Sequence, residues 1–148
     1  MISYSTESSI SIESEGTVSC TGDIRTLLNY EDPDNAVMGE YCFAGMFSGC
    51  KNLIEAPSLP AATLADDCYK RMFCNCTSLE KAPELPAAEL AKGCYEEMFY
   101  NCTSLEKAPE LPAATLSANC YSGMFSRCTS LEKAPELPAA ELADVCYS

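Results

Sequence analysis

Apolar side chains recur every 26 residues from Cys42 to the end of the sequence. The four complete units are 42–67, 68–93, 94–119 and 120–145, and a fifth begins at Cys146. A constant period with constant apolar columns is typical of identical coils stacked on one another, each covering the core of its neighbour. The pattern therefore predicts an α/β repeat solenoid over 42–148. Its predicted core ladders contain Cys42, Cys68, Cys94, Cys120, Cys50, Cys76, Cys102, Cys128, Met72, Phe73, Leu79, Leu85 and Leu90.

Each coil is predicted to contain one short helix. Leu90, Cys94 and Met98 are spaced at i, i+4 and i+8, which is the spacing of one face of a helix. We expect equivalent helices to start near Asp66, Lys92 and Ala118 in successive coils.

Each coil is also predicted to contain one brief strand. Residues 77–86 have an extended pattern, but Pro83 and Pro86 have no N–H to donate to a sheet. The paired strand is therefore expected at about Leu79 to Ala82.

Residues 1–41 do not follow the period and are predicted to form an N-terminal cap. Apolar residues alternate on both sides of a turn at Ser14–Gly16, which indicates a small β-hairpin. Thr21 or Asp23 is placed to N-cap a short helix that runs to Leu28. Such a cap would cover the core of the first coil.

The charge balance excludes some classes of partner. Acidic residues outnumber basic ones 22 to 9, so the formal net charge is −13. Nucleic acids and anionic membrane surfaces repel such a chain, so neither is expected as a partner. The sequence has 0 histidines, which removes the usual general base and the commonest zinc ligand. We expect no catalytic residue, no metal and no cofactor.

The first nine residues have neither a basic region nor an apolar core, so they do not resemble a signal peptide. No apolar run approaches the ~18 residues that span a bilayer, and no direct membrane insertion is expected. The fifth unit stops at Ser148. Three interpretations of this end stay open. The sequence is a piece of a longer chain, the uncapped last coil stacks on another copy, or the end is frayed.

The repeat motif M-F-x-x-C-T-S-L-x-x-A-P-x-L-P resembles the BspA-type leucine-rich repeats of bacterial surface proteins. The segments that carry the resemblance are 73–79, 99–105 and 125–131, and it covers about 70% of the chain. The sequence departs from that family in its Met column, in one additional residue before the Pro and in its cysteines. The resemblance implies leucine-rich-repeat-like coils in a larger surface-attached chain with a role in adhesion. Cytoplasmic and virion-associated locations stay open.

Nine of the 11 cysteines occupy two ladders. Neighbouring ladder positions would lie about 5 Å apart with parallel side chains, which is poor geometry for a disulfide. We expect free thiols in the core, with one or more disulfides, or zinc, as alternatives. Cys20 and Cys74 lie outside the ladders and are expected to be the exposed or reactive thiols.

Charged and aromatic columns form the candidate binding surface. The glutamate columns would repel along their length, and an adjacent lysine column offsets them in part. Calcium bridging between glutamates is the alternative to a solvated face. A tyrosine column beside the cysteines could bind a glycan or a protein, or pack inside the coils. The candidate surface residues are Tyr69, Tyr95, Tyr121, Lys70, Arg71, Glu96, Glu97, Glu80, Lys81, Glu84, Glu106, Lys107 and Glu110.

These features and the resemblance favour a non-enzymatic bacterial surface module that binds or adheres to a protein or a glycan. The alternative is a structural spacer or self-stacking filament segment, including a phage-type fibre or receptor-binding chain. An enzyme would need a carboxylate pair in a deep cleft, which identical coils rarely make.

Overall fold

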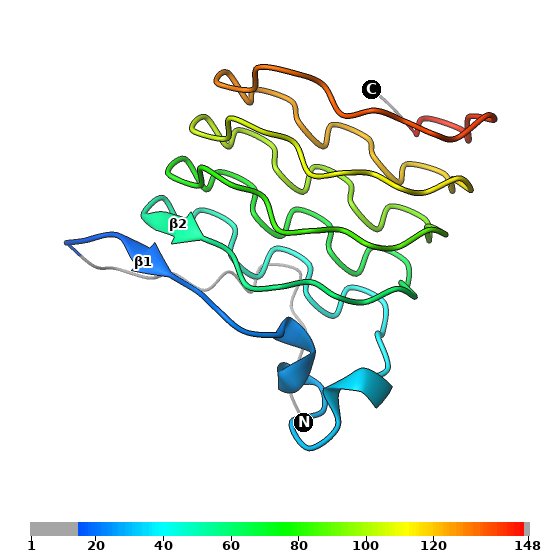
Figure 1. The fold of residues 1–148 in the computed structure, drawn as a ribbon, viewed down its shortest axis with the longest axis horizontal. Helices are drawn as coiled ribbons and strands as arrows, with labels where there is room; N and C mark the ends of the chain where they lie inside the picture. The colour runs from blue at the N-terminus through cyan, green and yellow to red at the C-terminus, as the bar shows by residue number, and fades with distance from the viewer. Residues whose placement is uncertain (1–14, 147–148) are drawn as a thin grey trace.

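From residue 41 onward the chain runs in successive coils, each lying on the one before it (Figure 1). The computed structural model describes residues 15–146. Parallel bridges join Glu55 to Lys81 and Lys81 to Lys107, which are equivalent positions in neighbouring coils. Each coil has two long sides, and they differ in how their backbone groups are bonded.

One long side is an irregular chain of tight turns, here named the turn ribbon: residues 41–50, 67–76, 93–102 and 119–128. Alternate N–H groups bond in two directions. Phe73 N–H donates to the carbonyl of Met98 in the next coil at 3.0 Å, whereas Met72 N–H donates back to Tyr69 at 3.1 Å. Half of the donors therefore hold the ribbon together and half hold neighbouring coils together.

The turn ribbon replaces the predicted short helix of each coil, so that expectation is corrected. An α-helix bonds its interior N–H groups within the segment, which would leave none to join neighbouring coils. The ribbon instead repeats every four residues, with positive φ at Gly93, Glu97 and Asn101. Its buried residues include Cys94 and Met98, which are four residues apart. Over a segment this short, that spacing cannot be distinguished from the buried face of a helix.

Left-handed backbone positions recur throughout the ribbon. The positive-φ residues between 41 and 127 are Tyr41, Gly45, Gly49, Asp67, Arg71, Asn75, Gly93, Glu97, Asn101, Asn119, Gly123 and Arg127. Eight of these twelve are Gly, Asn or Asp, the residues that adopt this conformation at least cost.

Gly93 is the position where this geometry is tightest. Its φ is +58°, and a Cβ placed there would clash with Oδ1 of Asp67. We expect Gly93→Ala to lower the free energy of unfolding by about 1–3 kcal/mol, measured by urea denaturation. Gly45→Ala, with φ +63° and open space around it, should cost less, and Gly39→Ala, with neither constraint, should change little. Equal losses at all three positions would contradict this account.

The other long side is extended and only sparsely paired. β2 (Leu53–Glu55) is the strand in the first coil. The later coils have isolated bridges, at Lys81 and Lys107 in positions equivalent to Glu55 and also between Glu89 and Thr115. The strand expected at Leu79 to Ala82 is thus reduced to a bridge at Lys81. The two prolines that follow have no N–H, which limits further pairing.

The core between the two sides is built from columns of like residues. Phe73 stacks on Phe47 and on Phe99 with ring centroids 5.6 Å apart in both pairs. Tyr95 stacks on Tyr69 at 6.0 Å with nearly parallel planes. Aromatic pairs in this range of distances add to the free energy gained by burial. The leucines of the ladders, Leu79, Leu85 and Leu90, are buried with them.

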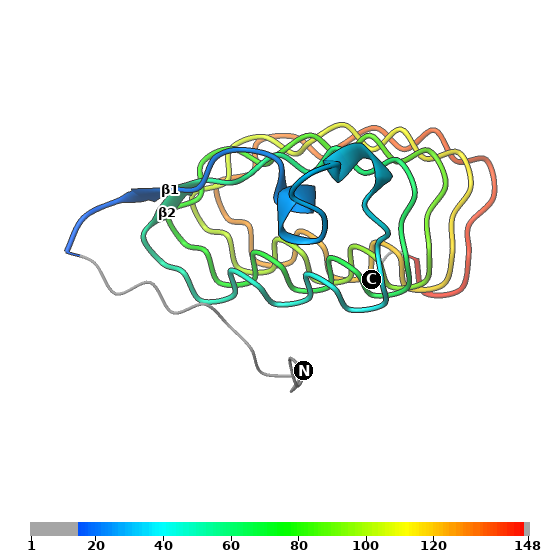
Figure 2. The same cartoon turned by 90° about the horizontal axis from the view of Figure 1, so that it is seen from below.

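An N-terminal segment lies across the lower end of the stack (Figure 2). Its elements are β1 (Val18–Ser19) and the 3-10 helices η1 (Ile24–Leu27) and η2 (Pro33–Asn35). β1 pairs in parallel with β2, with Val18 opposite Leu53 and an irregularity before the next pair. The first arm of the predicted hairpin lies outside the described residues.

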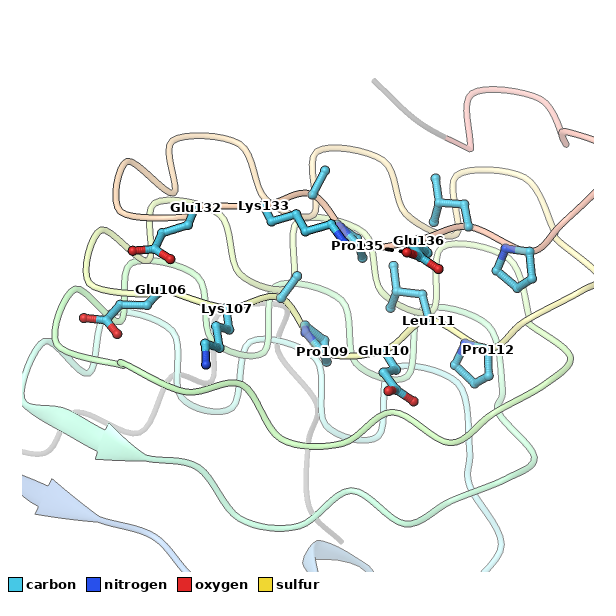
Figure 3. Close-up of a pocket in the computed structure, with 14 residues that line it drawn as sticks. Glu106, Lys107, Pro109, Glu110, Leu111, Pro112, Glu132, Lys133, Pro135 and Glu136 are labelled. Atoms are coloured by element: carbon cyan, nitrogen blue, oxygen red, sulfur yellow. Dashed lines mark ion pairs between the residues drawn. The ribbon is translucent and has the colours of Figure 1, made fainter.

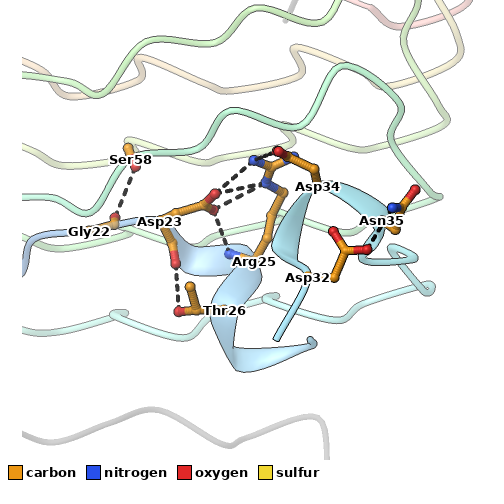
Figure 4. Close-up of polar contacts among 8 residues, drawn as sticks. All are labelled: Gly22, Asp23, Arg25, Thr26, Asp32, Asp34, Asn35 and Ser58. Carbon is orange, nitrogen blue, oxygen red and sulfur yellow. Dashed lines mark hydrogen bonds and ion pairs between the residues drawn. The ribbon is translucent and has the colours of Figure 1, made fainter. Parts of the chain in front are cut away.

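A polar cluster holds this cap together (Figure 4). The carboxylate of Asp23 accepts the backbone N–H of Arg25 at 2.8 Å and so caps η1. The Arg25 guanidinium pairs with Asp23 at 2.7 Å and with Asp34 at 2.8 Å. The hydrogen bond from Arg25 lowers the pKa of the Asp23 carboxyl. Ser58 Oγ donates to Gly22 O at 3.0 Å, which ties the cap to the first coil.

Candidate functional site

The extended side of the later coils presents a flat charged surface, here named the extended face: residues 80–86, 106–112 and 132–138. In the inner coils leucines point inward, because Leu85 and Leu111 are buried, while the flanking glutamates and Pro86 are exposed. The two prolines of each segment fix φ locally and favour this extended conformation. Each of these three coils therefore displays the same polar groups in the same order.

The charges of the extended face are exposed and unbalanced. Its six glutamates are Glu80, Glu84, Glu106, Glu110, Glu132 and Glu136, and its three lysines are Lys81, Lys107 and Lys133. Lys133 Nζ lies 3.6 Å from Oε1 of Glu136, and both side chains are largely exposed. Such an exposed pair contributes little to stability. The face therefore has a formal charge of 3 − 6 = −3.

A shallow groove of about 850 Å³ lies on this face between residues 106–112 and 132–138 (Figure 3). Its lining combines Pro109, Pro112 and Leu111 with the charged Glu110 and Glu136. Apolar groups and carboxylates together suit an extended polypeptide that carries basic side chains. The titratable side chains of its lining are all glutamates and lysines.

The charged residues at the variable positions of the turn ribbon pair with one another. Lys70 Nζ lies 3.0 Å from Oε2 of Glu96 in the next coil. Arg71 donates to the carboxylate of Glu97, again across one coil boundary. These four candidate surface residues therefore neutralise each other and hold the second and third coils in register. Opposite charges at positions 26 residues apart are the sequence signal that predicts such pairs.

The tyrosine column is part of the core. Its inclusion in the candidate binding surface was therefore wrong. The exposed fractions of Tyr69, Tyr95 and Tyr121 are 1%, 1% and 4%. Burial raises the pKa of the Tyr69 and Tyr95 hydroxyls. The Tyr69 hydroxyl has no hydrogen-bond partner among the described residues. A glycan cannot stack on rings that are covered in this way.

One cysteine ladder joins neighbouring coils through its thiols. Cys76 Sγ donates to Phe47 O at 3.0 Å, and Cys102 Sγ donates to Phe73 O at 3.1 Å. Cys68, Cys76, Cys94 and Cys102 are free thiols and fully buried. The thiol is thus both a small core group and a weak donor to a carbonyl of the preceding coil.

Cys74 is not the exposed thiol that its place outside the ladders suggested. It is 7% exposed and accepts a hydrogen bond from Asn75 Nδ2 at 3.3 Å. Cys20 is half-buried. Burial raises the pKa of both thiols, so neither is activated as a nucleophile.

Within residues 15–146, no group of three or more Cys, Asp or Glu side chains is placed to hold a metal ion. No helix among the described residues is long and apolar enough to cross a membrane. Comparison with protein-family models, with curated proteins and with solved structures finds no match. The likeness to BspA-type repeats therefore stays a prediction from the motif.

Proposed function

We propose that this chain is a non-enzymatic repeat module that binds a basic protein segment through its extended face. The observation that carries the proposal is the repetition of exposed glutamates beside a groove lined with prolines and leucines. The core position of the tyrosines removes the aromatic platform that would favour a glycan. The motif resemblance supports presentation on a bacterial surface, in an adhesive role.

Electrostatic attraction would direct the partner to this face. The formal charge of −13 favours encounter with basic proteins, and a repeated carboxylate column offers each bound basic side chain an equivalent partner. Affinity for such a partner should fall as ionic strength rises, because exposed charges are screened.

A matched pair of variants tests the proposal. The face variant changes Glu84, Glu110 and Glu136 to Gln, and the control changes Glu15, Glu31 and Glu40 to Gln, so that both alter the net charge equally. Labelled protein is applied to arrays of purified extracellular matrix proteins and of glycans. We expect signals on protein spots that fall about tenfold in the face variant, since three contacts of roughly 0.5 kcal/mol each are lost.

The control variant should bind within about twofold of the unaltered chain, because its charges lie outside the face. Equal weakening of binding in both variants would show that the interaction depends only on net charge. That result would contradict binding through the extended face. Signals confined to glycan spots, or no signal at all, would also overturn the proposal.

A further inference from the structure

The charges along the groove of the extended face follow a fixed order. Both walls of the groove have the same sequence, Glu-Lys-Ala-Pro-Glu-Leu-Pro. The Glu132 N–H donates to Glu106 O at 3.2 Å, so the two walls lie in register. Figure 3 accordingly shows Glu132 across from Glu106 and Glu136 across from Glu110. The groove therefore has a first acidic pair (Glu106 and Glu132) and a second acidic pair (Glu110 and Glu136) along its length.

The carboxylates of the two acidic pairs are available to a ligand. All four glutamates are exposed, and within residues 15–146 only Glu136 pairs with a lysine. That ion pair joins Oε1 of Glu136 to Lys133 Nζ at 3.6 Å between largely exposed groups, so it competes weakly with a ligand. Lys107 and Lys133 lie between the acidic pairs in the sequence of each wall, which disfavours a ligand that is basic at every position.

The distance between the two acidic pairs selects the conformation of the ligand. Glu106 and Glu110 are four residues apart on an extended wall, which corresponds to roughly 13 Å at about 3.3 Å per residue. An extended ligand places its side chains i and i+4 on one face at this same separation. In an α-helix these side chains are only about 6 Å apart along the axis, and a helix about 10 Å across is wider than the spacing of about 4.8 Å between neighbouring coils.

The lining between the acidic pairs has an apolar part. Pro109 and Pro135 occupy equivalent positions on the two walls, and both are half-buried. In an extended ligand, residue i+2 points to the same side as i and i+4 and lies halfway between them. That residue would therefore meet the two prolines, and an apolar side chain suits this position.

We propose that the groove recognises an extended protein segment with basic residues at positions i and i+4, an apolar residue at i+2 and uncharged residues at i+1 and i+3. This inference rests on the proposed function and adds the spacing that distinguishes one basic segment from another. Each basic side chain binds between the two glutamates of one acidic pair, and the apolar side chain packs on the prolines. Separate subsites for alternate side chains of an extended peptide give specificity beyond net charge.

Three labelled peptides of identical composition test the spacing. Gly-Lys-Ser-Val-Ser-Lys-Gly has its lysines at i and i+4 around a central valine, Gly-Lys-Val-Lys-Ser-Ser-Gly has them at i and i+2, and Gly-Ser-Lys-Lys-Val-Ser-Gly has them adjacent. Binding to the full chain is measured by fluorescence anisotropy in 20 mM NaCl, where exposed charges are screened least. We expect the first peptide to bind about fivefold more tightly than either of the others, because only its two lysines reach both acidic pairs.

Two matched double variants locate the contact. Glu106→Gln with Glu132→Gln removes the first acidic pair, whereas Glu80→Gln with Glu84→Gln removes two charges from the extended face outside the groove. We expect the groove variant to bind the three peptides equally, while the control variant retains the preference of about fivefold for the first peptide. Circular dichroism melts confirm that both variants are folded.

The outcomes separate this inference from the proposed function. Equal binding of the three peptides to the unaltered chain would overturn the spacing but leave the proposed function standing, since a basic segment would still bind. Loss of the preference in the control variant would also overturn the spacing, because the contact would then lie outside the groove. Binding by none of the peptides, while proteins on the arrays still respond to loss of the face glutamates, would overturn the inference alone. If both measurements fail, the proposed function fails as well.

Discussion

Raising the pH from 8 to 10.5 is expected to lower the free energy of unfolding by roughly 8 kcal/mol, which is comparable with the whole stability of a typical domain. The main cause is four of the fully buried thiols in the cysteine ladders, Cys68, Cys76, Cys94 and Cys102. Burial raises the pKa of Cys68 and of Cys76 from 9.0 to about 12, and it raises the pKa of Cys94 and Cys102 as well.

The direction follows from which state binds the proton more tightly. The folded chain holds these thiols neutral, whereas the unfolded chain ionises them above pH 9.0. Their contribution to stability is therefore complete below pH 9 and is lost as the pH rises toward the folded value of about 12. At pH 10.5 each thiol accounts for roughly 2 kcal/mol of the loss. The buried tyrosines, whose pKa values are also raised, add to the loss above pH 10.

Urea denaturation at pH 8 and pH 10.5, followed by circular dichroism under oxygen-free reducing conditions, measures the effect. A variant with Cys68→Ala and Cys94→Ala retains half of the four thiols, so its loss between the two pH values should fall to roughly 4 kcal/mol. It also controls for the general effect of lysine deprotonation. An unaltered chain that loses less than about 2 kcal/mol would show that the thiols are not buried in this way.

The core of the coils is the part of the fold that the sequence predicts best. The leucine column that contains Leu79 and Leu105 has the same residue in every repeat, and so does the phenylalanine column beside it. In the inner coils the structure buries both columns. Burial needs only a constant period and constant apolar character, and both are visible in the sequence.

The conformation of the turn ribbon could not be predicted from the period of the apolar residues. A four-residue repeat and a helix of 3.6 residues per turn place the same positions inward over two turns. Each ribbon turn buries two adjacent side chains, such as Cys94 with Tyr95 and Met98 with Phe99. This pairing explains why the tyrosines lie in the core. The sequence signal for left-handed turns was the recurrence of Gly, Asn and Asp residues at intervals of four.

The candidate site was predictable in outline only. Glutamates that alternate with leucines on an extended segment have to face the solvent, as Glu84 does beside Leu85. Which charges pair with each other depends on the position of one coil relative to the next. The pair of Lys70 and Glu96 lies one 26-residue period apart, so it becomes visible in the sequence once the repeats are aligned with one another.

The second large effect concerns the phenylalanine column. Phe99 is fully buried between Phe73 at 5.6 Å and Phe125 at 5.8 Å. Phe99→Ala is expected to lower the free energy of unfolding by about 3–5 kcal/mol, because it removes a ring from both interfaces and leaves a cavity. Urea denaturation at pH 7.5 measures the loss.

Phe125→Ala is the matched control, because it makes the same change in the same column where no described coil follows. Phe125 is only half-buried, so its loss should be about half as large. Coils interact only with their neighbours, so damage at the end of the stack should fray one coil while damage at Phe99 divides the stack. Amide hydrogen exchange should accordingly rise only in residues 120–146 for Phe125→Ala but in 68–119 as well for Phe99→Ala. Equal losses from the two substitutions would mean that stability does not depend on contacts between successive coils.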